Sequence, residues 1–151
     1  MTSKKDLETK VLLAARDNGI SAVLFRNATR RKLGLSVADS ECLSLLATKG
    51  VLTPTKLARY TGLTSGSTTA MLDRLEKEQF ITRTPNVRDR RGILVAVSGR
   101  YTKATEPLVT GVLKAHKGLL ASYSVKELEV VDDFLTRFTR NITEQTVALD
   151  K

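Results

Sequence analysis

Residues 54–79 read PTKLARYTGLTSGSTTAMLDRLEKEQ, a pattern that predicts a short helix, a tight turn and a second helix. Thr53 precedes the stretch as an N-cap, and Pro54 suits the first helical position, where a missing N–H costs nothing. Ala58 is small enough for two helices to cross closely, and Gly62 can adopt the left-handed conformation of the turn. We therefore predict a helix-turn-helix.

A β-hairpin is predicted directly after these helices. Residues 80–84 and 93–97 are rich in β-branched or aromatic side chains, and they flank a polar segment, 85–92. An α-helix fits the major groove of DNA, and a hairpin with a basic tip can reach an adjacent groove. The stretch therefore predicts a winged helix-turn-helix that binds double-stranded DNA.

Two helices are predicted on the N-terminal side of this region. Residues 4–32 contain no proline and repeat apolar side chains at helical spacing, which indicates one long helix. Gly34 interrupts the pattern, and Ser36 followed by Asp39 then forms a cap for a helix that runs to about Lys49.

Two more helices are predicted on the C-terminal side. The helical spacing returns after Ser98, with Pro107 expected to bend this helix or to mark a late start. Ser124 and Glu127 form a capping box for the last helix. That helix repeats apolar residues at alternating spacings of three and four, which predicts a partner helix along a stripe of Leu128, Val131, Leu135, Phe138 and Ile142.

The composition is that of a globular protein with a polyanionic partner. The 25 basic residues exceed the 16 acidic residues and give a net charge of +9, which is compatible with DNA, RNA or an anionic membrane. No long apolar run or leader-like N-terminus is present, so we expect a cytoplasmic protein with no membrane segment. The single cysteine fits a reducing compartment.

Hydroxyl side chains are concentrated at the start of the second helix of the helix-turn-helix. Small hydroxyls beside free N–H groups suit phosphates and base edges, although helix capping by Thr64 or Ser65 is the simpler interpretation for any one of them. Five hydroxyls in six positions exceed what capping needs. The predicted recognition residues are Thr64, Ser65, Ser67, Thr68, Thr69 and Arg74.

The hairpin tip carries three arginines around one aspartate: Arg88, Asp89, Arg90 and Arg91. An isolated cluster of this kind is usually a solvated charged surface. Its place after a helix-turn-helix instead favours a wing whose arginines enter a narrow minor groove, with Asp89 holding one of them.

Motifs of catalysis and metal binding are missing from the sequence. There is no glycine-rich phosphate loop and no nucleophile motif, and the carboxylates are scattered along charged helix faces. His116, the only histidine, lies near Lys114 and Lys117 and is expected to face solvent. We expect no enzyme activity, no metal and no cofactor.

From residue 35 to residue 98 the sequence resembles the MarR family of regulators. Most of the likeness is carried by MLDRLE at 71–76 with the strand that follows to Arg83, and by DRRGILVAVS at 89–98. The resemblance implies a wing role for Asp89 and the two arginines that follow it. Three residues depart from the family pattern: Ala70 replaces an arginine that is frequent there, and Gln79 and Tyr101 replace glycines.

The resemblance also implies a homodimer in which the terminal helices interlock. The expected fold is mainly α with a small β-hairpin wing, with residues 35–97 as the DNA-binding region and 1–34 and 98–151 as a helical dimerisation region. The dimer interface is expected to include the heptad stripe together with Leu7 and Val11. Family members bind small aromatic or anionic effectors, and some sense peroxide with a cysteine. Cys42 lies among leucines with no histidine nearby and is interpreted as a core residue.

The favoured hypothesis is a sequence-specific transcriptional repressor, with an activator as the alternative. A dimer would read a pseudo-palindrome with half-sites roughly 34–36 Å apart. Thr55, Lys56 and Arg74 are expected to contact phosphates while the hydroxyls read bases. Two other classes remain open: a non-specific or architectural nucleic-acid coat, and a winged-helix module for protein interaction.

Overall fold

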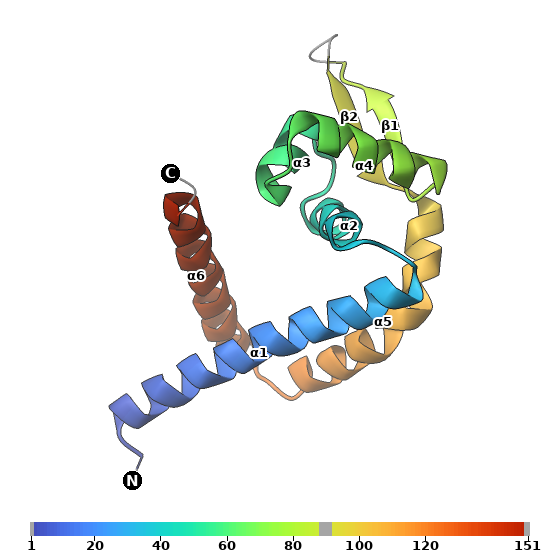
Figure 1. Cartoon of the computed structure of the whole chain (residues 1–151). Helices are drawn as coiled ribbons and strands as arrows, with labels where there is room; N and C mark the ends of the chain where they lie inside the picture. The colour runs from blue at the N-terminus through green and yellow to red at the C-terminus, as the bar shows by residue number, and fades with distance from the viewer. Residues whose placement is uncertain (1, 88–91, 150–151) are drawn as a thin grey trace. The chain divides into compact units, whose positions relative to one another are not determined.

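The computed structural model describes residues 2–87 and 92–149 of the chain. They form two compact units, one ending at Leu108 and the other beginning at Val109. The first unit contains α1 to α4, the two strands and the start of α5, and the second contains the rest of α5 together with α6 (Figure 1). The predicted class, mainly α with a small β-hairpin, is confirmed. The assignment of separate DNA-binding and dimerisation regions stays a prediction.

The first two helices begin at capping boxes. In α1, Lys4–Lys32, the Asp6 N–H donates to the Ser3 hydroxyl while the Ser3 N–H donates back to the Asp6 carboxylate. The same reciprocal pair starts α2, Val37–Lys49, with Ser36 and Asp39. Each box satisfies two N–H groups that a helix start leaves unpaired, and it does so with residues only three positions apart.

The helix-turn-helix follows the sequence prediction closely. Thr53 caps α3, Pro54–Thr61, with Pro54 in its first turn. Gly62 then adopts φ +67°, a left-handed conformation that suits a residue without a Cβ atom. Thr64 accepts the N–H of Ser67 and so caps α4, Ser65–Lys77. The predicted turn therefore ends α3 and begins α4.

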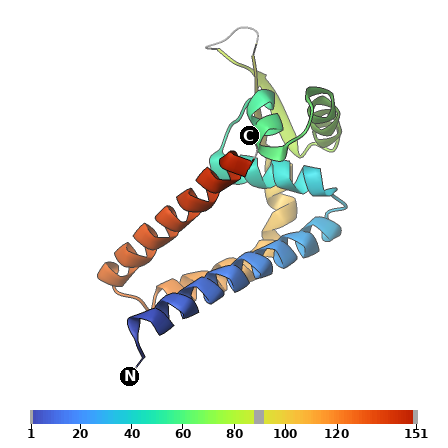
Figure 2. The ribbon, with the colours of Figure 1, turned by 60° about the vertical axis from the view of Figure 1, so that its left-hand side comes forward.

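The two strands, β1 Ile81–Pro85 and β2 Ile93–Val97, form an antiparallel hairpin that lies beside α4 and also contacts α2 and α3 (Figures 1 and 2). Ile81 faces Val97 and Pro85 faces Ile93, and Leu52 adds a short bridge to Val95. The predicted first strand began one residue too early. Phe80 instead closes the end of α4, because its N–H donates to the Leu75 carbonyl at 2.9 Å.

One hydrophobic core holds the first unit together. It lies among α2, α3, α4 and the hairpin, and α4 contributes the i, i+3, i+4, i+7 face that a buried helical stripe requires. Its members are Leu35, Cys42, Leu43, Leu46, Leu52, Leu57, Met71, Leu72, Leu75, Phe80, Ile81 and Val95. This core fixes α4 and the hairpin relative to α2.

The long helices differ from the first unit's core elements in their burial. No residue is buried in α1, in α5 Gly99–Leu120 or in α6 Val125–Leu149, all of which the structure describes in full. Pro107 lies inside α5, so it does not mark a late helix start. No helix within residues 2–87 or 92–149 combines the length and apolarity needed to cross a membrane.

Candidate nucleic-acid interface

The N-terminal end of α4 presents a cluster of exposed hydroxyl side chains. Thr64, Ser65, Ser67 and Thr69 are exposed, and Gly66 between them adds no side chain. The Thr64 hydroxyl accepts the Ser67 N–H at 3.2 Å and also lies 3.0 Å from the Ser67 hydroxyl. Because hydroxyls can both donate and accept, the row can meet phosphate oxygens or base edges without a charge penalty.

Thr68 corrects one of the sequence predictions. Its side chain is only 2% exposed, and its hydroxyl donates to the Thr64 carbonyl at 2.9 Å. Thr68 shares the buried face of α4 with Met71, Leu72 and Leu75, so this side chain cannot reach a base edge. Thr69, one residue later, is exposed and keeps its place in the candidate interface.

Arg74 lies near the end of α4 and contacts α2. Its guanidinium is 2.5 Å from the carboxylate of Asp39, and a second N–H, from Nε, reaches the same group at 3.3 Å. Burial alone raises the pKa of Asp39, but hydrogen bonds from Arg74 and Ser36 outweigh it and hold that pKa below its ordinary value. The side chain predicted to contact phosphate is thus engaged in a pair that sequence reasoning missed.

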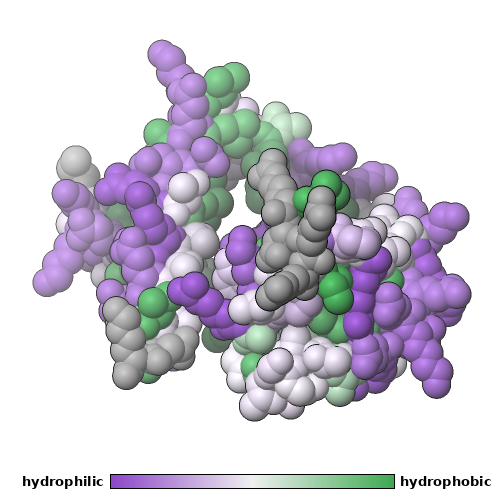
Figure 3. Space-filling model, turned by 90° about the horizontal axis from the view of Figure 1, so that it is seen from above, coloured by the Kyte–Doolittle hydropathy of each residue, from purple (hydrophilic) through white to green (hydrophobic). Residues whose placement is uncertain are grey.

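The start of α3 lies on the surface of the same unit. Thr55 and Lys56, the predicted phosphate contacts, are both exposed. Arg59 and Tyr60 are exposed further along the helix, and the Lys49 ammonium lies 5.4 Å from the centre of the Tyr60 ring. Seen from the hairpin side in Figure 3, pale side chains of near-neutral hydropathy gather at the lower centre, with purple hydrophilic ones toward the right.

Ion pairs attach the hairpin to α4. Arg83 on β1 lies 2.6 Å from Asp73 and 3.4 Å from Glu76, both on α4, and its side chain is only 20% exposed. At the far end of the strands the Asn86 N–H donates to the Gly92 carbonyl at 2.9 Å. The predicted wing residues Arg88, Asp89, Arg90 and Arg91 lie outside the described residues, so their role stays a prediction.

The remaining candidate residues are Cys42, His116 and the carboxylates. Cys42 is fully buried, and burial together with the nearby charge of Asp39 raises the pKa of its thiol to about 12. A reactive thiolate is therefore disfavoured, as expected for a core cysteine. His116 is exposed. Within the described ranges no three His, Cys, Asp or Glu side chains are grouped as a metal site would require.

Known proteins resemble this chain in sequence. Residues 35–93 match the model of the MarR family. A regulator of Bacillus subtilis named uncharacterized HTH-type transcriptional regulator YcgE is 31% identical over 133 residues, which is 88% of this chain and 86% of that protein. The chain belongs to the MarR family.

Solved structures of MarR-type regulators share this fold. The transcriptional regulator Tm0710 of Thermotoga maritima aligns with a TM-score of 0.59 at 18% identity, covering 91% of this chain and 98% of that one. A cysteine-to-serine mutant of MarR from E. coli, crystallised with operator DNA, aligns with a TM-score of 0.50 at 22% identity, covering 88% and 98%. These likenesses establish the winged-helix architecture.

The three departures from the MarR pattern have different structural settings. Ala70 is exposed on α4, so the arginine frequent there is replaced by a side chain without a donor. Gln79 has φ +59°, a conformation that favours glycine, while its side-chain oxygen accepts from Arg100 at 3.1 Å. Tyr101 packs edge-on against Phe80 with ring centres 5.8 Å apart. Burial raises the pKa of the Tyr101 phenol.

Proposed function

We propose that this protein is a transcriptional regulator that binds operator DNA with α4 in the major groove and the hairpin in an adjacent groove. The exposed hydroxyl row at the N-terminal end of α4 carries the proposal. It lies where the helix dipole is positive and where a MarR-type fold directs its recognition helix. Lys56 on α3 supplies a cation for the DNA backbone, and the net charge of +9 favours a polyanion.

The proposed active form is a homodimer. The long helices expose large apolar side chains that water-facing helices seldom carry, including Leu7, Val11, Val131, Leu135 and Ile142. On α6, Val131, Leu135 and Ile142 follow the heptad stripe, whose other members, Leu128 and Phe138, are half-buried. A second copy offers a matching stripe, and its two-fold symmetry would suit a pseudo-palindromic operator.

We further propose that the protein is a repressor released by a small aromatic anion. A hollow of about 460 Å³ near the end of α1 is lined by Phe25, Ala28, Thr29, Arg31, Lys32 and Leu108. Its apolar lining suits an aromatic ring, and its two cations suit a carboxylate. Benzoate should release bound operator, and Arg31→Gln should raise the concentration needed. Equal release by uncharged benzamide would contradict this ligand class.

The experiment that tests DNA recognition is enrichment of randomised duplex DNA at about 0.15 M salt, followed by titration of the winner against scrambled DNA. We expect a pseudo-palindrome bound about a thousandfold tighter than scrambled sequence. Equal affinity for unrelated duplexes would instead identify a non-specific nucleic-acid coat. No affinity for any duplex would favour a protein-interaction module.

Sedimentation of the free protein tests the dimer separately. A mass of two chains at micromolar concentration is expected, and a single-chain mass both with and without DNA would contradict the proposal.

A further inference from the structure

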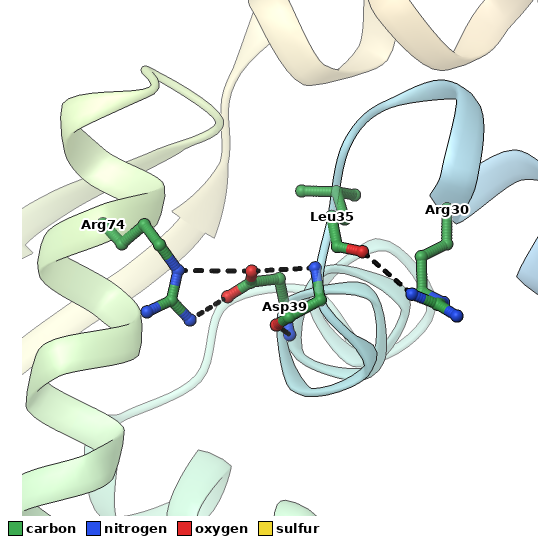
Figure 4. A network of polar contacts seen from close by, with 5 residues as sticks. Arg30, Leu35, Asp39 and Arg74 are labelled. Carbon is green, nitrogen blue, oxygen red and sulfur yellow. Dashed lines mark hydrogen bonds and ion pairs between the residues drawn. The ribbon is translucent and has the colours of Figure 1, made fainter.

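Arg74 shares one face of α4 with exposed residues, yet its guanidinium is turned back toward α2. Ser67, Ala70 and Arg74 follow one another at spacings of three and four, and the first two are exposed. The Arg74 side chain is half exposed, whereas the Asp39 side chain that it contacts is 5% exposed. Figure 4 shows the two N–H donors of Arg74 directed at the carboxylate of Asp39.

The position of the Asp39 carboxylate is fixed by a second contact. One carboxylate oxygen accepts the Ser36 N–H at 3.1 Å, and the Asp39 N–H donates to the Ser36 hydroxyl at the same distance. This capping box ties the carboxylate to the first turn of α2. Arg74 therefore contacts an anchored group, not a mobile surface acid.

The same corner is bonded to the last turn of α1. Arg30 donates to the Leu35 carbonyl at 3.1 Å (Figure 4). The Arg30 Nε also lies 3.3 Å from the side-chain oxygen of Asn27. Hydrogen bonds thus connect the end of α1, the start of α2 and α4. Apart from the Asp39–Arg74 pair, α2 and α4 meet through the apolar core, whose contacts are non-directional.

The paired hydrogen bonds between Arg74 and Asp39 constrain the rotation of α4 on α2. The buried face of α4 holds this helix against α2, and the two hydrogen bonds from Arg74 add a fixed direction to that contact. Moving Arg74 to a phosphate would leave the nearly buried Asp39 carboxylate without its cation, which is strongly unfavourable. A single exposed phosphate contact offsets little of that cost.

We propose that Asp39 and Arg74 are positioning residues that fix the rotation of α4 on α2 and so place the exposed hydroxyls. Arg74 acts through Asp39 and does not contact a phosphate. The inference rests on the proposed function, since it takes α4 as the helix that meets DNA.

The test measures operator affinity against salt concentration for Arg74→Gln, Asp39→Asn and the double variant, with Lys56→Gln as the phosphate-contact control. Asparagine keeps an oxygen for the Ser36 N–H, so the α2 cap survives. We expect both single variants to lose about tenfold or more in operator affinity, and the double variant to bind no more weakly than either. The slope of log affinity against log salt concentration should stay unchanged in all three. Lys56→Gln should instead lower the slope by about one.

A direct phosphate contact by Arg74 predicts different changes in the affinity and in its salt dependence. If Arg74 contacts a phosphate, Arg74→Gln lowers the slope by about one, and Asp39→Asn leaves affinity unchanged or raises it by freeing the arginine. Arg74→Lys separates the two roles further, because lysine keeps the charge but cannot form the two-pronged bond. Recovery of wild-type affinity in Arg74→Lys would overturn the inference.

Amide hydrogen exchange without DNA tests the placement of α4 on α2 separately from DNA binding. Asp39→Asn and Arg74→Gln should both speed exchange in α4, while Lys56→Gln should not. If the wild-type protein selects no duplex, the proposed function fails and exchange alone decides the positioning role. Unchanged exchange in α4 in both variants would refute it.

Discussion

Leucine is buried in one part of this chain and exposed in another. Leu43, Leu57 and Leu75 in the winged helix are at most 1% exposed, whereas Leu24 on α1 and Leu135 on α6 are more than half exposed. The first group fills a core shared by three helices and a hairpin, which a single chain can complete. The second group lies on helices in which no residue is fully buried. The winged helix thus has its own source of stability, whereas many apolar side chains of the long helices stay exposed in the single chain.

The largest effect is expected from a cavity in the winged-helix core. Leu43→Ala should lower the free energy of unfolding by about 3 kcal/mol, because it removes buried methyl groups and leaves a void. Urea denaturation measures this loss. Val51→Ala, at a position 56% exposed, is the matched control and should change the free energy by less than about 0.5 kcal/mol. Equal losses of unfolding free energy in Leu43→Ala and Val51→Ala would contradict the contrast between buried and exposed apolar positions.

A charge on the heptad stripe should act on the other region. Leu135→Glu places a carboxylate in the proposed dimer seam and should weaken dimerisation about a hundredfold, about 2.7 kcal/mol, as measured by sedimentation equilibrium. Thr136→Glu adds the same charge to an adjacent exposed position off the stripe, and it should leave the dimer intact. Dissociation by Thr136→Glu alone would assign the interface to another face.

Acid should weaken the winged helix through Asp39. Its folded pKa lies below the ordinary aspartate value of about 3.9, so its stabilising contribution is complete above that value and is lost as pH falls through the folded pKa. The difference in unfolding free energy between wild type and Asp39→Asn should therefore be largest near neutral pH and shrink in acid. Urea titrations from about pH 7 to pH 3 measure it. A difference independent of pH would refute the ion pair.

The smallest effect concerns the junction of α4 and β1. Gln79→Gly should raise the free energy of unfolding by about 1 kcal/mol, because glycine adopts a positive φ without strain. Loss of the contact between the Gln79 side chain and Arg100 reduces this gain. Gln79→Ala loses that contact but keeps the strained backbone, so it should be destabilised by about 0.5 kcal/mol. Thermal unfolding compares the two. A lower stability for the glycine variant than for the alanine variant would contradict the argument.

The sequence predicted those features that depend on neighbouring residues. The caps at Ser36, Thr53 and Thr64 are confirmed because each needs only a hydroxyl within three residues of a free N–H. Thr68 was misassigned because its hydroxyl was counted as polar surface. Its spacing of three from Met71 and four from Leu72 places it on the buried face of α4.

Features that depend on tertiary contacts were out of reach of the same reasoning. Asp39 and Arg74 are 35 positions apart, and only the packing of α4 on α2 brings them together. The early start predicted for the first strand has a similar cause, since Phe80 reads as a strand residue but closes the end of α4. The wing arginines and the terminal stripe stay predictions.

The burial of Cys42 makes the rate of thiol labelling a measure of core opening. A thiol reagent cannot reach a fully buried sulfur, and a thiol whose pKa is raised to about 12 carries almost no thiolate at neutral pH. Because this is the single cysteine of the chain, the rate of labelling at neutral pH reports the opening of the winged-helix core. Labelling rates with and without operator DNA would then report whether DNA slows the opening of this core.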